Sequence, residues 1–118
     1  MPHRIALASS NGKVIDQHFA QARNFQIVDL FEDRYLLVET RNIQPVPGGK
    51  GHSTGVWENI AGLLADCEGV FVSRIGYGAA AYLNSIGLRV FEAPYPLESV
   101  LKKLLAGKIL ETEKESNE

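Results

Sequence analysis

The sequence has little cysteine, no long apolar run and no excess of basic residues. Its single cysteine, Cys67, excludes an internal disulfide and a self-contained thiolate cage for zinc or an iron–sulfur cluster. No stretch approaches the roughly 18 apolar residues of a membrane span, and the apolar part of Met1–Ala8 is too short for a signal peptide. The formal net charge is −2, which gives no support for nucleic-acid binding. We expect a cytoplasmic protein that binds neither membranes nor nucleic acid.

Motifs for enzymatic chemistry are also missing. The sequence has no serine–histidine–acid motif, no His-Glu-x-x-His, no Cys-x-x-Cys and no Gly-Lys-Ser/Thr phosphate loop. A two-metal nuclease needs several carboxylates that converge on one strand end, and the first apolar strand, Ile5–Ser9, has none. These absences predict a protein that is not an enzyme.

The composition that remains is that of an ordinary globular domain. Of 118 residues, 45% are hydrophobic and 22% are charged. Apolar segments continue almost to the end, but residues 111–118 are charged and nearly free of them. We expect one α/β domain over residues 1–110 and a charged flexible tail over residues 111–118.

The central segment Asp66–Phe91 predicts a complete strand–loop–helix–turn–strand unit. Val70–Val72 is a short apolar run typical of a buried parallel strand. Ala79–Ile86 favours a helix that ends at Gly87, and Leu88–Phe91 is a second apolar strand. Two parallel strands joined by a helix require a right-handed crossover, which places the loop Ser73–Gly78 at the carboxyl edge of the sheet.

The flanking patterns add three strands and two helices. Two of the strands form a hairpin, and Thr54 is positioned to cap the first added helix. The predicted elements are strands at Ile5–Ser9, Phe25–Leu30 and Tyr35–Thr40, and helices at Val56–Ala65 and from Pro96 to Gly107. The result is a mixed five-stranded sheet with one antiparallel strand and helices on its faces. Its carboxyl edge should gather the loops Ser9–Asn24, Asn42–Gly55 and Ser73–Gly78.

Three residues are candidate metal ligands. His18 lies in a loop between polar neighbours, and imidazole is the commonest protein metal ligand; the alternative is a histidine that caps a turn. Cys67 is a soft donor, but its position between a helix and a buried strand favours a core role. His52 lies in a glycine-rich loop and is either a ligand or an exposed surface residue.

The segment Ile75-Gly-Tyr-Gly78 opens the central helix. Backbone N–H groups at a helix start attract anions, so this loop could hold a negatively charged group together with nearby cations. The candidate cations are Arg74, Arg23, Lys13 and Lys50. The alternative is that the glycines let strand and helix approach closely and that each cation is ordinary surface.

Three motifs carry a resemblance to a known family. They are Ile5-Ala-Leu-Ala-Ser with Asp16-Gln-His-Phe-Ala-Gln-Ala-Arg-Asn-Phe25, then Asp66-Cys-Glu-Gly-Val-Phe-Val-Ser-Arg-Ile-Gly-Tyr-Gly-Ala79, and Leu83-Asn-Ser-Ile-Gly-Leu-Arg-Val-Phe91. In this order and spacing the chain resembles the dinitrogenase iron–molybdenum cofactor biosynthesis family. The resemblance implies a ribonuclease H-like three-layer fold. A related member, the orange protein of sulfate reducers, holds a molybdenum–copper sulfide cluster non-covalently.

The resemblance also implies a function in nitrogen fixation: the binding and delivery of a metal–sulfur cluster that contains molybdenum with iron or copper. It makes His18 the implied ligand. The expected binding residues are His18, Arg74, Ile75, Gly76, Tyr77, Gly78, Arg23 and His52. The expected partners are the cluster and a cofactor-assembly or acceptor protein. The alternative is a regulatory or protein-interaction module that keeps the fold without the metal.

Overall fold

The computed structural model describes residues 3–43 and 53–105. The glycine-rich loop with Lys50 and His52, and the tail 111–118, lie outside these ranges. The described elements are β1 (His3–Ala8), the 3-10 helix η1 (Phe19–Gln21), β2 (Asn24–Leu30), β3 (Tyr35–Asn42), α1 (Ser53–Leu63), β4 (Gly69–Val72), α2 (Tyr77–Ser85), β5 (Arg89–Glu92) and α3 (Leu97–Leu105).

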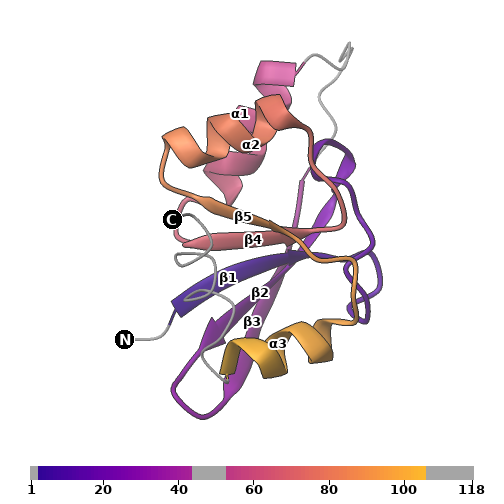
Figure 1. Cartoon of the computed structure of the whole chain (residues 1–118), viewed down its shortest axis with the longest axis vertical. Helices are drawn as coiled ribbons and strands as arrows, with labels where there is room; N and C mark the ends of the chain where they lie inside the picture. The colour runs from indigo at the N-terminus through magenta and orange to yellow at the C-terminus, as the bar shows by residue number, and fades with distance from the viewer. Residues whose placement is uncertain (1–2, 44–52, 106–118) are drawn as a thin grey trace.

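The five strands form one mixed sheet in the order β3-β2-β1-β4-β5 (Figure 1). β2 is antiparallel to both of its neighbours, β1 and β3, whereas β4 is parallel to both β1 and β5. The predicted mixed five-stranded sheet and the predicted hairpin are therefore confirmed. The ribonuclease H-like label stays a prediction.

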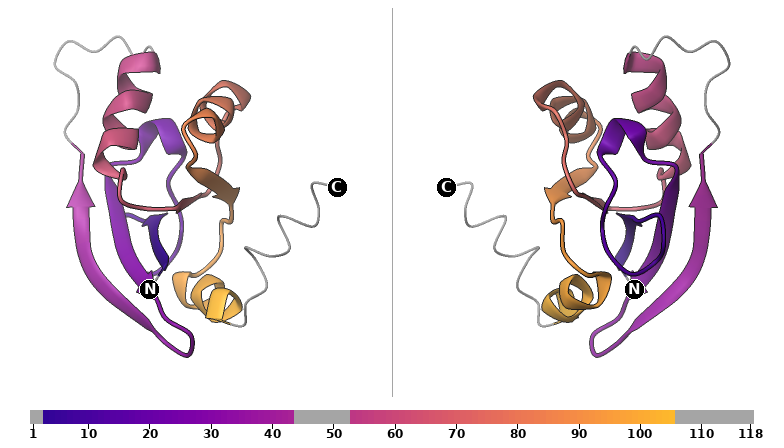
Figure 2. Two further views of the ribbon diagram at one scale, coloured as in Figure 1. Left: turned by 90° about the vertical axis from the view of Figure 1, so that its left-hand side faces the viewer. Right: turned by 90° about the vertical axis from the view of Figure 1, so that its right-hand side faces the viewer.

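Helices cover both faces of the sheet, with α1 and α2 on one side and α3 on the other (Figure 2). Apolar side chains of β1 point alternately to the two faces of the sheet, so helices must bury both faces. Ala6 and Ala8 belong to the apolar cluster under α1 and α2, while Ile5 and Leu7 belong to the cluster under α3. All four side chains are fully buried, so the first strand is the centre of the core.

The central unit β4–α2–β5 matches the predicted strand–helix–strand segment. Gly87 follows α2 with φ +88°, the left-handed conformation predicted for the residue that ends the helix. Helix starts differ from the prediction by a few residues. α1 begins at Ser53, so Thr54 lies inside its first turn and does not precede it. α3 begins after Pro96, where the Leu97 N–H donates to the Lys13 carbonyl oxygen at 2.9 Å. This contact, distant in sequence, pairs an N–H group at the start of the helix that has no partner within the helix.

None of the helices within 3–43 and 53–105 is long and apolar enough to cross a membrane.

Candidate functional site

The loops after β1 and β4 meet at the carboxyl edge of the sheet, on the right of Figure 1. The Phe19 N–H donates to the Arg74 carbonyl oxygen at 2.9 Å, and the Ser73 N–H donates to the Gln17 carbonyl oxygen at 2.9 Å. These two bonds flank His18, whose backbone forms a parallel bridge with Arg74. The structure therefore confirms that the first and third predicted loops gather at one edge. Most of the second predicted loop lies outside the described residues.

The loop that carries His18 is fixed by its own polar side chains. The Gln17 side-chain oxygen accepts hydrogen bonds from the backbone N–H groups of Arg23 and Asn24, at 3.1 and 3.2 Å. The Asp16 carboxylate accepts the Ser10 N–H at 2.9 Å and the Ser10 hydroxyl at 2.6 Å. Desolvation raises the pKa of Asp16, but these hydrogen bonds outweigh it and hold the pKa below its ordinary value.

Phe19 anchors the same loop in the core, since its side chain is only 1% exposed. His18 precedes it and is exposed. A buried anchor directly beside an exposed imidazole fixes the histidine backbone while its ring stays accessible. This is the arrangement that a preorganised ligand needs.

A cleft of about 260 Å³ opens where the two loops meet. Its walls combine an exposed imidazole, an exposed guanidinium, a buried aromatic ring and backbone. They come from His18, Phe19, Gln21, Arg74, Ile75 and Gly76. In the described part of the chain, neither the His18 nor the Arg74 side chain takes part in a hydrogen bond or an ion pair. Both groups are therefore available to a molecule in the cleft.

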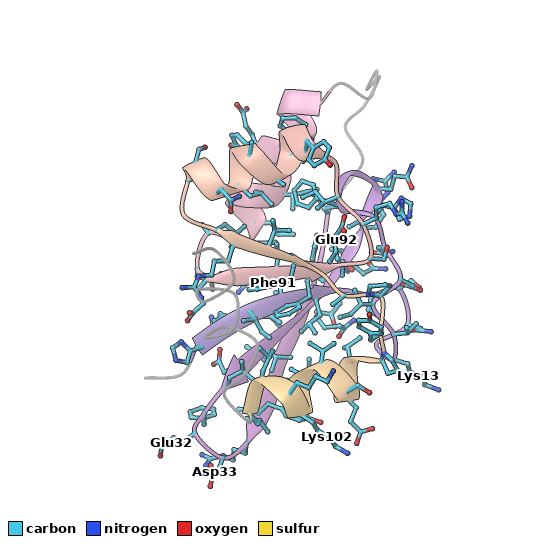
Figure 3. The ribbon with its side chains drawn as sticks, in the orientation of Figure 1. Lys13, Glu32, Asp33, Phe91, Glu92 and Lys102 are labelled. Carbon is cyan, nitrogen blue, oxygen red and sulfur yellow. The ribbon has the colours of Figure 1, made fainter. Side chains whose placement is uncertain are left out.

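The backbone at the start of α2 contributes less than the sequence suggested. Gly76 is the residue before the helix, and no side chain caps the helix start. The Ile75 N–H, however, already donates to Glu92 Oε2 at 2.9 Å. Figure 3 shows Glu92 at the end of β5, beside these loops. The sequence analysis missed Glu92, although an acidic residue directly after a predicted strand at the same edge was a usable signal.

The other predicted residues of this segment do not line the cleft. A Cβ added to Gly78 would lie 3.0 Å from Trp57 Cη2, so this glycine lets α1 and α2 approach closely. Tyr77 is 97% exposed and stands beside the cleft. Arg23 is exposed but is not among the lining residues. The structure adds Phe19 and Gln21, which the sequence analysis did not place in the site.

Cys67 is a core residue, as the sequence analysis favoured. It is 8% exposed and belongs to the apolar cluster under α1 and α2, and it precedes β4 at the amino end of the strand. Burial, with a smaller effect from the Asp66 carboxylate, raises the pKa of the Cys67 thiol to about 12. Because a thiolate is the metal-binding form, this position disfavours ligation. Lys13 points outward from the protein near the start of α3 (Figure 3), and His52 lies outside the described residues.

Within residues 3–43 and 53–105, no group of three or more histidine, cysteine, aspartate or glutamate side chains is placed to hold a metal ion. What the cleft offers is one imidazole, one guanidinium and backbone beside a buried aromatic ring. The described residues form a small α/β domain with a cleft at the carboxyl edge of a mixed sheet, and His18 lines that cleft. The chain belongs to the family described as "Dinitrogenase iron-molybdenum cofactor", whose sequence model matches residues 1–107.

Relatives of known name agree with this assignment. The chain is 32% identical over 108 residues to the FeMo cofactor biosynthesis protein NifB of Chlorobaculum tepidum. The aligned region covers 90% of this chain and 24% of NifB. It is 24% identical over 108 residues to the protein NifX of Rhodobacter capsulatus. This alignment covers 87% of this chain and 68% of NifX. The chain thus spans about a quarter of the length of this NifB and about two thirds of this NifX.

Two solved structures share the fold. The crystal structure of PH0822 superposes with a TM-score of 0.68 at 22% identity, over 90% of this chain and 92% of that one. A crystal structure from Methanocaldococcus jannaschii, described as a candidate dinitrogenase, gives a TM-score of 0.60 at 13% identity, over 91% of each chain. These similarities support the architecture and carry no information about the ligand.

Proposed function

We propose that the chain carries a metal–sulfur cluster, or a precursor of one, in the His18 cleft. The observation that supports this most directly is that hydrogen bonds on both sides of His18 fix its backbone, while its exposed imidazole lies in the wall of a cleft of about 260 Å³. The description of the family names the iron–molybdenum cofactor, and the name of the NifB relative refers to biosynthesis of that cofactor. The proposed cargo therefore contains molybdenum with iron, or with copper as in the related orange protein, and the proposed role is in nitrogen fixation.

The chemistry of the cleft suits such a cargo. A neutral imidazole is a good donor to a transition metal at the surface of a cluster. Sulfide-rich clusters carry net negative charge, which the Arg74 guanidinium would balance through charge-assisted hydrogen bonds. The backbone at Gly76, before α2, adds the positive end of a helix. His18 would be the protein ligand, and the other groups would hold the cluster without coordination bonds.

In this proposal the protein is a carrier and not an enzyme. The residues in the cleft provide a ligand and a counter-charge, and they form no nucleophile–base pair. Delivery requires that an assembly or acceptor protein reach the cargo in the cytoplasm, and the exposed Tyr77 beside the cleft is positioned to contact it. A tyrosine in such a place supplies apolar area and a hydroxyl at low cost in side-chain entropy.

The test uses anaerobically purified full-length chain and two probes: isolated iron–molybdenum cofactor, and a mixture of tetrathiomolybdate with a cuprous salt. We expect one of them to give a coloured complex that co-elutes with the protein in a fixed metal-to-protein ratio. Trp57, the single tryptophan, packs against Gly78 beside the cleft, so its fluorescence gives a second measure of binding.

The decisive comparison is between two histidines. His18→Ala should weaken cluster binding at least tenfold, because it removes the proposed coordination bond. His3→Ala is the matched control, since His3 is exposed at the other end of the sheet, where its Nδ1 lies 2.7 Å from Glu68. Equal binding by His18→Ala and wild type would show that His18 is not the ligand. Failure of both probes to bind wild type would instead favour a regulatory or protein-interaction module without metal.

A further inference from the structure

A second cavity lies on the opposite face of the sheet, between β5 and α3. Its volume is about 450 Å³, larger than that of the His18 cleft. It lies within the size range of small-molecule sites, which are largely apolar with a few polar groups at the rim. None of the residues that line it lines the His18 cleft, so it is a separate feature of the molecule.

The floor of this cavity is aromatic. The rings of Phe71 and Phe91 stack with centroids 4.7 Å apart and planes at 15°. Phe71 is fully buried, whereas Phe91 is only partly covered at the sheet edge (Figure 3). Pro96 and Val100 close the apolar lining. A flat ring system fits such a surface, because aromatic groups gain additional energy by offset stacking or edge-to-face contact.

The polar groups of the rim are divided between two sides. Ser99 and Lys103 are four residues apart on α3, so they lie on one face of the helix. Lys103 makes no ion pair within the described residues, whereas the neighbouring Lys102 pairs with Glu98 at 3.5 Å. Ser99 and Lys103 therefore present a hydroxyl and an ammonium group to a ligand with a carboxylate.

The other side of the rim is acidic. Glu92 lines the cavity at the end of β5, and its carboxylate is held by the Ile75 N–H at 2.9 Å. A fixed negative charge there repels a ligand anion and directs it toward α3. The geometry points to a site for a small aromatic carboxylate of one or two rings, with its ring on Phe91 and its acid group at Lys103 and Ser99.

The test is a titration of the full chain, labelled with ¹⁵N, with 2-naphthoate, followed by amide chemical shifts. We expect saturable shifts at Phe91–Ala93 and Ser99–Lys103, with a Kd of about 1 mM, typical of a ligand of this size. The neutral analogue 2-naphthalenemethanol should bind more weakly, because it lacks the charge. Absence of saturable shifts at these residues, or equal affinity for the two probes, would overturn the proposal.

Two neighbouring lysines separate the proposed contact from a general effect of positive charge. Lys103→Gln should weaken 2-naphthoate binding about threefold to fivefold, as expected for an exposed ion pair. It should leave the affinity for 2-naphthalenemethanol unchanged. Lys102→Gln should change the affinity for neither of the two probes. Ser99→Trp should weaken both probes at least tenfold, since it fills the rim from an exposed position. The site is wrong if Lys102→Gln and Lys103→Gln behave alike, or if Ser99→Trp binds 2-naphthoate as wild type does.

Discussion

The cluster around Asp66 and the cleft beside His18 hold arginines in opposite electrostatic settings. At the amino end, Arg4 Nε lies 2.7 Å from Asp29 Oδ1, and Arg4 Nη1 lies 2.9 Å from Asp66 Oδ2. Arg41 extends from the carboxyl end of β3, and its Nη1 contacts Asp66 Oδ1 at 2.7 Å. At the carboxyl end, Arg74 is exposed and makes no ion pair within the described residues. The arginines that converge on Asp66 hold the fold together, whereas Arg74 remains available to a ligand.

The pKa directions show the same contrast. Hydrogen bonds from Arg41, and to a smaller extent from Arg4, hold the pKa of Asp66 well below its ordinary value despite some desolvation. The hydrogen bond from Arg4 likewise lowers the pKa of Asp29. Charges that satisfy one another in this way offer little to an external anion. The comparison teaches that the availability of an arginine to a ligand depends on whether a protein carboxylate already pairs with it.

The largest expected effect concerns Cys67 at the amino end. Because the thiol is buried and its pKa is raised to about 12, it should react with 5,5′-dithiobis(2-nitrobenzoate) at least about a hundredfold more slowly than in the unfolded chain. The release of thionitrobenzoate at pH 8, with and without denaturant, measures this. Cys67→Ala should bind the cluster like wild type. Rapid reaction of the native protein would instead place the thiol within reach of a metal.

Asp66→Asn should lower the free energy of unfolding by about 1 to 2 kcal/mol, because Arg4 and Arg41 lose a shared charged acceptor. Urea denaturation measures the change. Asp33→Asn is the matched control, since Asp33 is exposed in the hairpin turn (Figure 3) and meets Arg34 only at 3.4 Å. Its effect should stay within about 0.5 kcal/mol. Equal destabilisation by both variants would contradict the structural role given to the amino end.

Arg74→Gln should weaken cluster binding about threefold to tenfold and leave thermal stability unchanged, because the side chain is exposed and makes no protein contact among those described. Cluster titration at low and high salt is the measurement, and the difference from wild type should shrink as salt rises. Arg34→Gln, in the hairpin turn, should bind the cluster like wild type. If both variants weakened binding equally, overall charge and not the cleft would be responsible.

The smallest expected effect is a change in acid sensitivity. The folded pKa values of Asp66 and Asp29 lie below their unfolded values, so the stabilisation they provide is complete above about pH 5 and is lost as pH falls toward the folded pKa. The difference in Tm between wild type and Asp66→Asn should therefore narrow between pH 6 and pH 3. Thermal melts followed by circular dichroism test this. A constant difference across that range would show that the carboxylate charge does not contribute.

Much of the fold was predictable because its elements have strong local signals. The apolar run at Val70–Val72 predicted β4, and Gly87 was placed at the end of α2 because only glycine readily adopts positive φ. The hairpin followed from two apolar runs separated by a short polar segment. Helix starts were less predictable: α1 begins at Ser53 and not at Val56, and α3 begins one residue after Pro96.

The site was predictable in part. His18, Arg74, Ile75 and Gly76 do line one cleft, as expected from loops at the same sheet edge. Gly78 was interpreted as part of an anion-binding loop, but it faces Trp57 and serves helix packing. A glycine at this position suits an anion-binding loop as well as close packing of two helices. Only the position of α1 against α2 distinguishes the two roles.

The sequence by itself determined the class of this protein: an α/β domain with histidines in its loops, a cysteine in a position that favours the core and the motifs of its family. The tertiary structure decided which polar groups are free. Whether Arg4, Arg41 and Arg74 are paired, and whether the Ile75 N–H is available, depends on contacts with Asp66, Asp29 and Glu92 across the fold. Local propensity carries no information about such contacts, because they form only when strands distant in sequence are paired in register.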